Sequence, residues 1–116
     1  MQTLAGKTIA IHFMSKIENS DYYIYEVEIE NTTDSEAIYD MQNLYCTNGY
    51  NVLDAENFDV NLLNGKQLLL CGFIAVNGEK VGGCVAFEKN IKFVNQSPTF
   101  EYDDITFLSY SQQITL

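Results

Sequence analysis

The chain offers few residues that could perform acid–base chemistry. It has a single histidine, His12, and no tryptophan. A general base or a Ser-His-Asp triad would have to use His12, and no GxSxG sequence accompanies it. The alternation of the surrounding segment places His12 on a polar strand face, next to Lys16. We therefore expect an ordinary surface histidine rather than a catalytic one.

The three cysteines, Cys46, Cys71 and Cys84, are the possible nucleophiles. They lack a CxxC spacing, and with one histidine they form no recognisable zinc-site pattern. Cys84 falls on the outward-facing set of its segment, but a reactive thiol needs an electropositive environment, which this chain does not provide. We expect reduced, structural thiols. A Cys71–Cys84 disulfide is the alternative, because strand register decides whether the two face each other.

Acidic residues give a clearer chemical signal. Sixteen Asp and Glu stand against six basic residues, all Lys, for a formal net charge of -10. This balance disfavours direct binding to nucleic acid or to an anionic membrane surface, and it favours basic protein partners. Glu26, Glu28 and Glu30 alternate along one strand, so their common face must be solvated or meet a basic partner.

Further residues extend this candidate surface. Tyr22 shares the face of the three glutamates, and Tyr is enriched in protein interfaces because it combines apolar area with a polar tip. The acidic loop with Asp54, Glu56 and Asp59 is a second candidate. A weak calcium site there is the alternative to solvated acids, but no EF-hand spacing occurs and solvated acids are the simpler interpretation. We expect no metal and no cofactor.

The segments that must position these residues have the pattern of β-strands. Residues 22–31 alternate, with tyrosine and aliphatic side chains at the odd positions, opposite the acids. Residues 7–17 alternate as well, and we expect Ile9, Ile11, Phe13 and Ile17 to point inward. Residues Gln67–Val76 and Lys80–Glu88 flank Asn77-Gly78, the dipeptide best suited to a two-residue hairpin turn, and predict a β-hairpin.

About seven short strands, frequent turn signals and no sustained helical period predict an all-β fold. We expect one immunoglobulin-like antiparallel β-sandwich domain over residues 1–116. The apolar runs are too short for a transmembrane helix, so we expect no membrane insertion. The first residues lack the order of a secretory leader. The protein is expected to be cytoplasmic if Met1 is the native start, and extracellular or at the cell surface if a leader was removed.

Several segments together resemble a known family. EVEIEN at Glu26–Asn31, then ENFDVNLLNGKQL, NGEKVGGCVAFE at Asn77–Glu88 and DITFLSY at Asp104–Tyr110 follow one another along the chain. This order is similar to the telokin-like, immunoglobulin-related domain of unknown function found in Gram-positive lipoproteins and secreted proteins. The resemblance covers roughly residues 22–110. It implies a bacterial β-sandwich with a binding or scaffolding role and no catalytic residues.

These observations favour a non-catalytic protein-binding module that uses its acidic, tyrosine-bearing sheet face. The alternative is an intracellular acidic inhibitor, of the type carried by phages or mobile elements, that blocks a nucleic-acid-binding enzyme by placing carboxylates where phosphates would bind. An enzyme would need a concave pocket with His12 or a reactive thiol, and we expect none. The identity of the partner and the oligomeric state stay open.

Overall fold

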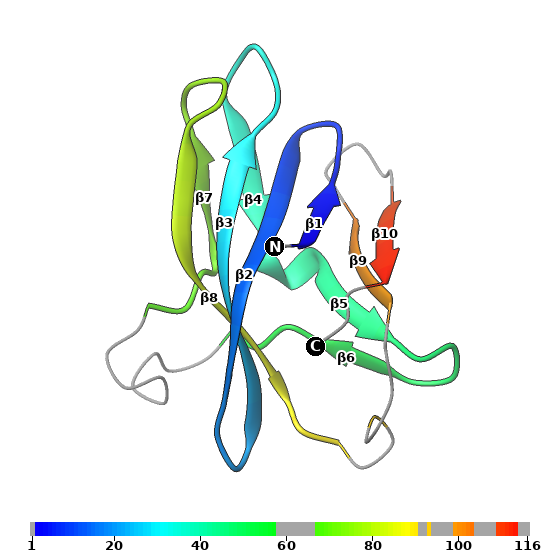
Figure 1. The fold of residues 1–116 in the computed structure, drawn as a ribbon. Coiled ribbons are helices and arrows are strands. Elements are labelled where there is room, and N and C mark those ends of the chain that lie inside the picture. The colour runs from blue at the N-terminus through cyan, green and yellow to red at the C-terminus, as the bar shows by residue number, and fades with distance from the viewer. Residues whose placement is uncertain (1, 58–66, 91–92, 94–98, 104–108, 114–116) are drawn as a thin grey trace.

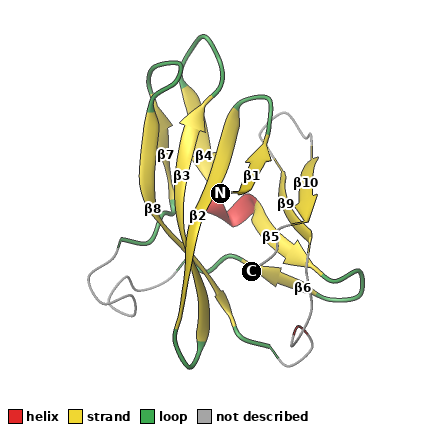
Figure 2. Cartoon of the chain, viewed as in Figure 1, coloured by secondary structure: helices red, strands yellow, loops and turns green. Residues whose placement is uncertain are grey.

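The chain folds into an antiparallel β-sandwich, as its sequence predicts. The computed structural model describes residues 2–57, 67–90, 93, 99–103 and 109–113 (Figure 1). Within these ranges lie ten strands and one short 3-10 helix (Figure 2). The count exceeds the expected seven because several strands have only three or four residues, too few to display an alternating pattern.

The first layer is a four-stranded sheet in the order β1-β2-β3-β8. It contains β1 (Gln2–Ala5), β2 (Ile9–Glu18), β3 (Tyr22–Asn31) and β8 (Lys80–Glu88). The turn between β2 and β3 closes on Asn19, whose side-chain oxygen accepts hydrogen bonds from the backbone N–H groups of Asp21 and Tyr22. This hairpin fixes the register that carries the acidic residues of β3.

The second layer consists of a sheet in the order β10-β9-β5-β6 and a separate pair, β4-β7. Its strands are β4 (Ala37–Asp40), β5 (Leu44–Thr47), β6 (Val52–Asp54), β7 (Cys71–Ile74), β9 (Thr99–Asp103) and β10 (Ser109–Gln113). Helix η1 (Met41–Asn43) joins β4 to β5, and the Asp40 carboxylate caps it by accepting from the backbone N–H of Gln42.

The two layers meet in one apolar core with an aromatic centre. Phe100 of β9 receives the edges or faces of three rings from the first layer. The ring centroids of Phe13, Tyr25 and Phe87 lie 5.3, 5.6 and 5.4 Å from that of Phe100, all in edge-to-face geometry. Such pairs contribute about 0.5–1.5 kcal/mol each beyond area burial, so this cluster holds the layers together.

Strand β2 departs from its predicted alternation at a β-bulge. The register shifts between Phe13, which is opposite Val27, and Ser15, which is opposite Glu26. Met14 is the extra residue, and it moves the following residues to the other face. Ile9, Ile11 and Phe13 are buried as predicted. The prediction for Ile17 is wrong. Ile17 lies opposite Ile24, on the side of the sheet away from the core, with 37% exposure.

The predicted hairpin at Asn77-Gly78 is also wrong, although the turn exists. The Glu79 N–H donates to the Val76 carbonyl at 3.0 Å, and Gly78 has a φ of 80°. However, β7 pairs with β4 and β8 pairs with β3, so the turn carries the chain from one layer to the other. A hairpin would need the second edge of β8, which is instead bonded to residues 67–69 through the backbone of Cys84.

Asn31 anchors the end of β3 where this crossing occurs. It is a buried polar residue, and its amide donates at 2.8 Å to the carbonyls of Ser35 and Ile74. Its side-chain oxygen accepts from the backbone N–H and the hydroxyl of Thr33. All its hydrogen-bonding groups are therefore used, and the β3–β4 turn is tied to β7.

Candidate functional site

The predicted acidic face is the outer face of β3, on the side away from the core. Tyr22, Glu26, Glu28 and Glu30 share this face, as the sequence predicts, and the residues directly opposite them on β8 are Glu88, Cys84, Gly82 and Lys80. Met14, Ser15 and Ile17 of β2 border the same face. We refer to this set as the outer face. The bulge in β2 is therefore what places two apolar residues beside the acids.

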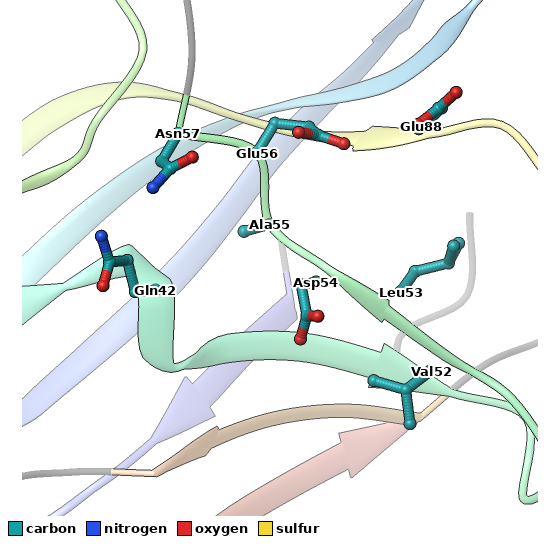
Figure 3. A pocket seen from close by; sticks show the side chains of 8 residues that line it. All are labelled: Gln42, Val52, Leu53, Asp54, Ala55, Glu56, Asn57 and Glu88. Atoms are coloured by element: carbon teal, nitrogen blue, oxygen red, sulfur yellow. The ribbon is translucent and has the colours of Figure 1, made fainter.

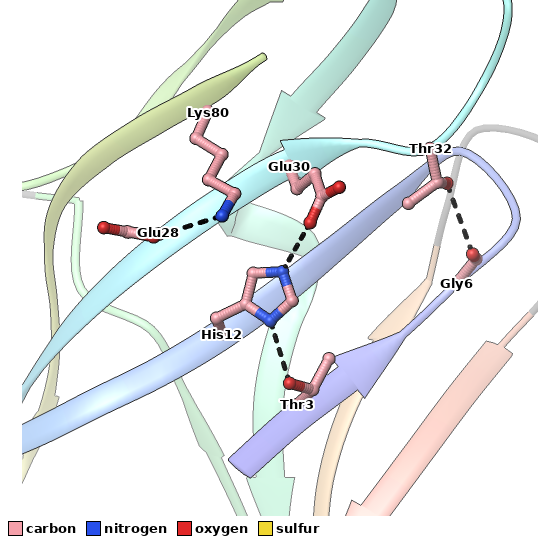
Figure 4. A network of polar contacts seen from close by, with 7 residues as sticks. All are labelled: Thr3, Gly6, His12, Glu28, Glu30, Thr32 and Lys80. Atoms are coloured by element: carbon pink, nitrogen blue, oxygen red, sulfur yellow. Dashed lines mark hydrogen bonds and ion pairs between the residues drawn. The ribbon is translucent and has the colours of Figure 1, made fainter. Parts of the chain in front are cut away.

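Each of the three glutamates has a neighbour within the chain. Glu30 Oε1 lies 2.8 Å from His12 Nε2, and Glu28 Oε2 lies 4.0 Å from the Lys80 Nζ (Figure 4). The Ser15 hydroxyl donates to Glu26 Oε2 at 3.1 Å. The Glu28 side chain keeps 41% exposure and that of Glu30 keeps 30%. The face is acidic and accessible. Its carboxylates are, however, partly paired within the chain, which the sequence pattern does not show.

His12 links three strands through its two ring nitrogens. Nδ1 lies 2.8 Å from the Thr3 hydroxyl on β1, while Nε2 faces Glu30 on β3 (Figure 4). The carboxylate can only accept, so Nε2 carries a proton. The order hydroxyl–imidazole–carboxylate is that of a Ser-His-Asp triad. Here, however, Thr3 and His12 are directly opposed neighbours on adjacent strands of a sheet face, which makes the arrangement a cross-strand ladder.

The outer face also contains a small apolar cluster that the sequence interpretation missed. Ile24, Leu68, Cys84 and Ala86 form it, and Tyr22 packs against it. Cys84 lies on the outward face of β8, as alternation predicts, but residues 67–69 cover it and leave 2% exposure. A signal for this was present. Cys84 to Phe87 is a continuous apolar run, which is typical of a strand covered on both faces, and all four residues are buried.

Tyr22 brings the two predicted acidic groups together. The start of β3 pairs with the end of β8, and the segment after β6 adjoins β8 there, since the Glu56 N–H donates to the Ala86 carbonyl at 2.8 Å. Partial burial raises the pKa of Tyr22, and the charges of Glu56 and Glu88 raise it further. Glu88, directly opposite Tyr22, was not predicted as a site residue. Asp59 lies outside the described residues.

An open hollow of about 470 Å³ adjoins this end of the outer face (Figure 3). The carboxylates of Asp54, Glu56 and Glu88 and the amides of Gln42 and Asn57 line it. Burial raises the pKa of Glu56, and the neighbouring charges of Glu88 and Asp54 add to the effect. The hollow is thus suited to a positively charged side chain, because such a group would relieve the repulsion among its acids.

A second open groove, of about 450 Å³, runs along the glutamates themselves. We call it the Gly82 groove. Gly82 and Cys84 of β8, Glu26 and Glu28 of β3, Met14 of the bulge and Gln67 line it. His12 lines neither this groove nor the hollow at Glu56.

The thiols have structural positions. All three cysteines are free in this structure, with Cys46 and Cys84 buried and Cys71 exposed, and the alternative Cys71–Cys84 disulfide is not formed. Burial raises the pKa of Cys46 to about 12, with a further contribution from Asp54. A thiol with so high a pKa stays protonated at neutral pH and is a poor nucleophile.

Across the part of the chain that the structure describes, no group of three or more His, Cys, Asp or Glu is arranged to hold a metal ion. No helix among the described residues has the length and apolar character needed to cross a membrane.

Comparison with known proteins identifies a fold rather than a family. The sequence matches no family model and no curated protein. The structure is similar to the crystal structure of the yjhA protein from Bacillus subtilis, with a TM-score of 0.72 and 13% sequence identity. The match covers 98% of this chain and 96% of that one. The two chains therefore share the same β-sandwich over nearly their whole lengths.

Proposed function

We propose that the domain is a non-catalytic binding module whose outer face takes a basic surface of a partner protein. One observation carries the proposal: accessible apolar side chains share this face with the acids. Met14, 47% exposed, lines the same groove as Glu26 and Glu28. Ile17, 37% exposed, lies opposite Ile24, and Tyr22 borders the acids of the Glu56 hollow. An apolar centre with a charged rim is the usual composition of a protein interface.

Each type of residue has a separate role in this mechanism. The carboxylates and the net charge of -10 attract a basic partner and raise the rate of encounter. Met14, Ile17 and Tyr22 contribute contact area that is lost from water on binding, which slows dissociation.

A non-catalytic role is supported by the state of the candidate nucleophiles and bases. The His12 ring is held on both sides by Thr3 and Glu30. Cys46 and Cys84 are buried, and the pKa of Cys46 is strongly raised.

The test is affinity capture from a lysate of the source cell at low and high salt, with bound proteins identified by mass spectrometry. The double variant Glu26→Lys/Glu28→Lys should lose a basic protein that the wild type retains at low salt and releases at high salt. The control, Asp34→Lys/Glu36→Lys, makes the same charge change in the exposed β3–β4 turn and should retain it. Equal retention by both double variants would contradict the choice of face.

The same row of glutamates favours a second proposal, an acidic inhibitor of a nucleic-acid-binding enzyme. Glu26, Glu28 and Glu30 lie at alternate positions of one strand, so their carboxylates form a regular row of negative charge. In this case the captured protein would bind nucleic acid, and added DNA would displace it from the domain. A partner indifferent to DNA would leave only the first proposal.

A further inference from the structure

The Gly82 groove has a floor of bare backbone for which the fold gives no reason. Among the five glycines at positions 49, 72, 78, 82 and 83, two have positive φ and two have neighbours too close for a side chain. Gly82 has neither: the nearest atom to an added Cβ would be the Val27 carbonyl oxygen, 3.9 Å away. A glycine inside a strand weakens it, and it often marks a place where a ligand approaches closely.

The walls of the groove are chemically divided. Glu28 lies directly opposite Gly82, and Glu26 lies opposite Cys84, so two carboxylates stand along one side. The exposed Met14 side chain borders the groove from the bulge in β2. Such a site matches a side chain with an apolar stem and a cationic end, which is the composition of lysine and arginine.

Lys80 shows that this row of carboxylates accepts an ammonium group. Its Nζ lies 4.0 Å from Glu28 Oε2, and its side chain is 51% exposed. An exposed pair at this separation is weak, so an incoming cation can replace it. Lys80 is therefore an internal competitor for the site, and it faces the same carboxylate from the adjacent strand.

From this geometry we infer that the Gly82 groove receives a single lysine or arginine side chain from the basic partner. The inference rests on the proposed function and specifies where the recognition occurs. The stem would pack on the Gly82 backbone and Met14, and the charged end would lie between Glu26 and Glu28.

NMR titration with a short peptide tests the inference directly. The probe is acetyl-Gly-Gly-Lys-Gly-Gly-amide, compared with the same peptide carrying an Nε-acetylated lysine and with its arginine analogue, at low ionic strength. The lysine peptide should shift the amide signals of Gly82 and Cys84 and the Met14 methyl signal saturably, whereas the acetylated peptide should not. The arginine analogue decides whether a planar guanidinium is accepted as well as an ammonium.

The substitution Gly82→Val separates the groove from general charge attraction, and Lys80→Gln tests the competition at Glu28. Gly82→Val fills the groove without changing any charge, and β-branched residues suit a strand, so the fold should persist. Loss of a charge-assisted contact should weaken peptide binding by about tenfold. Lys80→Gln removes the competitor and should strengthen binding.

The outcomes distinguish the inference from the function on which it rests. If Gly82→Val binds the peptide as the wild type does while Glu26→Gln/Glu28→Gln binds it more weakly, the acidic face is retained and the groove is rejected. If neither variant changes binding, both the groove and the acidic binding face are rejected. Absence of a saturable shift in the wild type also overturns the inference.

Discussion

Two adjacent glycines of β8 differ at the residue scale in what a methyl group would meet. An added Cβ at Gly83 would lie 2.6 Å from Leu69 Cγ and 3.1 Å from the Gln67 carbonyl oxygen, whereas at Gly82 its nearest neighbour would be the Val27 carbonyl oxygen at 3.9 Å. We expect Gly83→Ala to destabilise the fold by about 1–3 kcal/mol through overpacking. Gly82→Ala should be neutral or stabilising by up to about 1 kcal/mol. Urea unfolding of both variants gives the comparison, and equal losses would contradict it.

Asn31 gives a second residue-scale prediction. Asn31→Ala removes four hydrogen bonds and leaves the buried Ile74 carbonyl without its side-chain donor. Leaving a buried group unsatisfied costs about 1–3 kcal/mol, and we expect a loss in that range. Asn19→Ala is the control, because Asn19 closes an exposed turn where water can replace it. Asn19→Ala should lose less stability than Asn31→Ala. Thermal unfolding of the two variants checks this, and a larger loss for Asn19→Ala would contradict it.

Glu56 makes the stability depend on pH. Its pKa is raised in the fold, so ionisation is less favourable there than in the unfolded chain. The resulting destabilisation is absent at low pH and grows as pH rises through the unfolded and then the folded pKa. Glu56→Gln should therefore raise the melting temperature at pH 7. The free energy of unfolding should increase by at most about 0.5 kcal/mol. The gain should vanish below about pH 4, where the unfolded carboxyl is also protonated.

The matching control is Glu79→Gln, on the exposed turn before β8. A gain for Glu56→Gln that persists at low pH would show that packing, rather than charge, causes it.

At this scale, the alternation of residues predicted well which face of its strand a side chain occupies. It failed where an extra residue interrupts the strand, and it could not show where another segment covers a face. Tyr25, Val27 and Ile29 are buried opposite the acids, as alternation requires. Ile17 was misplaced because period-2 counting cannot detect the extra residue Met14. Cys84 was placed on the correct face, but its full burial was not predicted, because the segment that covers it comes from another part of the chain.

At the element scale, the bulge in β2 can be removed without changing the faces of the strand. Deleting Met14 joins Phe13 to Ser15, and both already occupy the positions opposite Val27 and Glu26 that a regular ladder would give them. We expect the deletion variant to fold, with the amide signals of β3 preserved in an NMR spectrum. It should also bind the lysine peptide more weakly, because one side of the Gly82 groove is lost. Unfolding of the deletion variant would contradict this reading of the bulge.

The turn at Asn77-Gly78 shows what local sequence can and cannot specify about elements. The dipeptide predicted a tight turn, and the turn is there. Its strand partners were predicted wrongly, because pairing depends on which strands compete for each edge of the sheet. Strand β8 lies between β3 and residues 67–69, so β7 pairs elsewhere. Neither competitor is visible in the turn sequence.

At the scale of the whole molecule, a net charge of -10 on 116 residues produces self-repulsion in the compact state. Salt screens charges over about 10 Å at 0.1 M, so we expect the melting temperature to rise with moderate sodium chloride. Asp34→Lys/Glu36→Lys replaces two negative charges with two positive ones, changes the net charge from -10 to -6, and should flatten this dependence. A melting temperature that falls with salt would indicate that ion pairs outweigh the repulsion.

The overall architecture was the most predictable level. An antiparallel β-sandwich follows from alternating segments and frequent turns, and it does not depend on any single pairing. The site was predictable in part. Tyr22 and the three glutamates share a face because one strand carries them, whereas Glu88, Met14 and Gly82 join them only through tertiary contacts.

The distribution of the thiols gives the protein a built-in attachment point for a spectroscopic label. Cys71 is exposed on the β4–β7 pair of the second layer, while Cys46 and Cys84 are buried. A maleimide dye should react once with each native chain and three times after denaturation. Cys71 lies in the second layer, and the outer face belongs to the first. A fluorophore on Cys71 would therefore report binding of a partner without occupying the outer face.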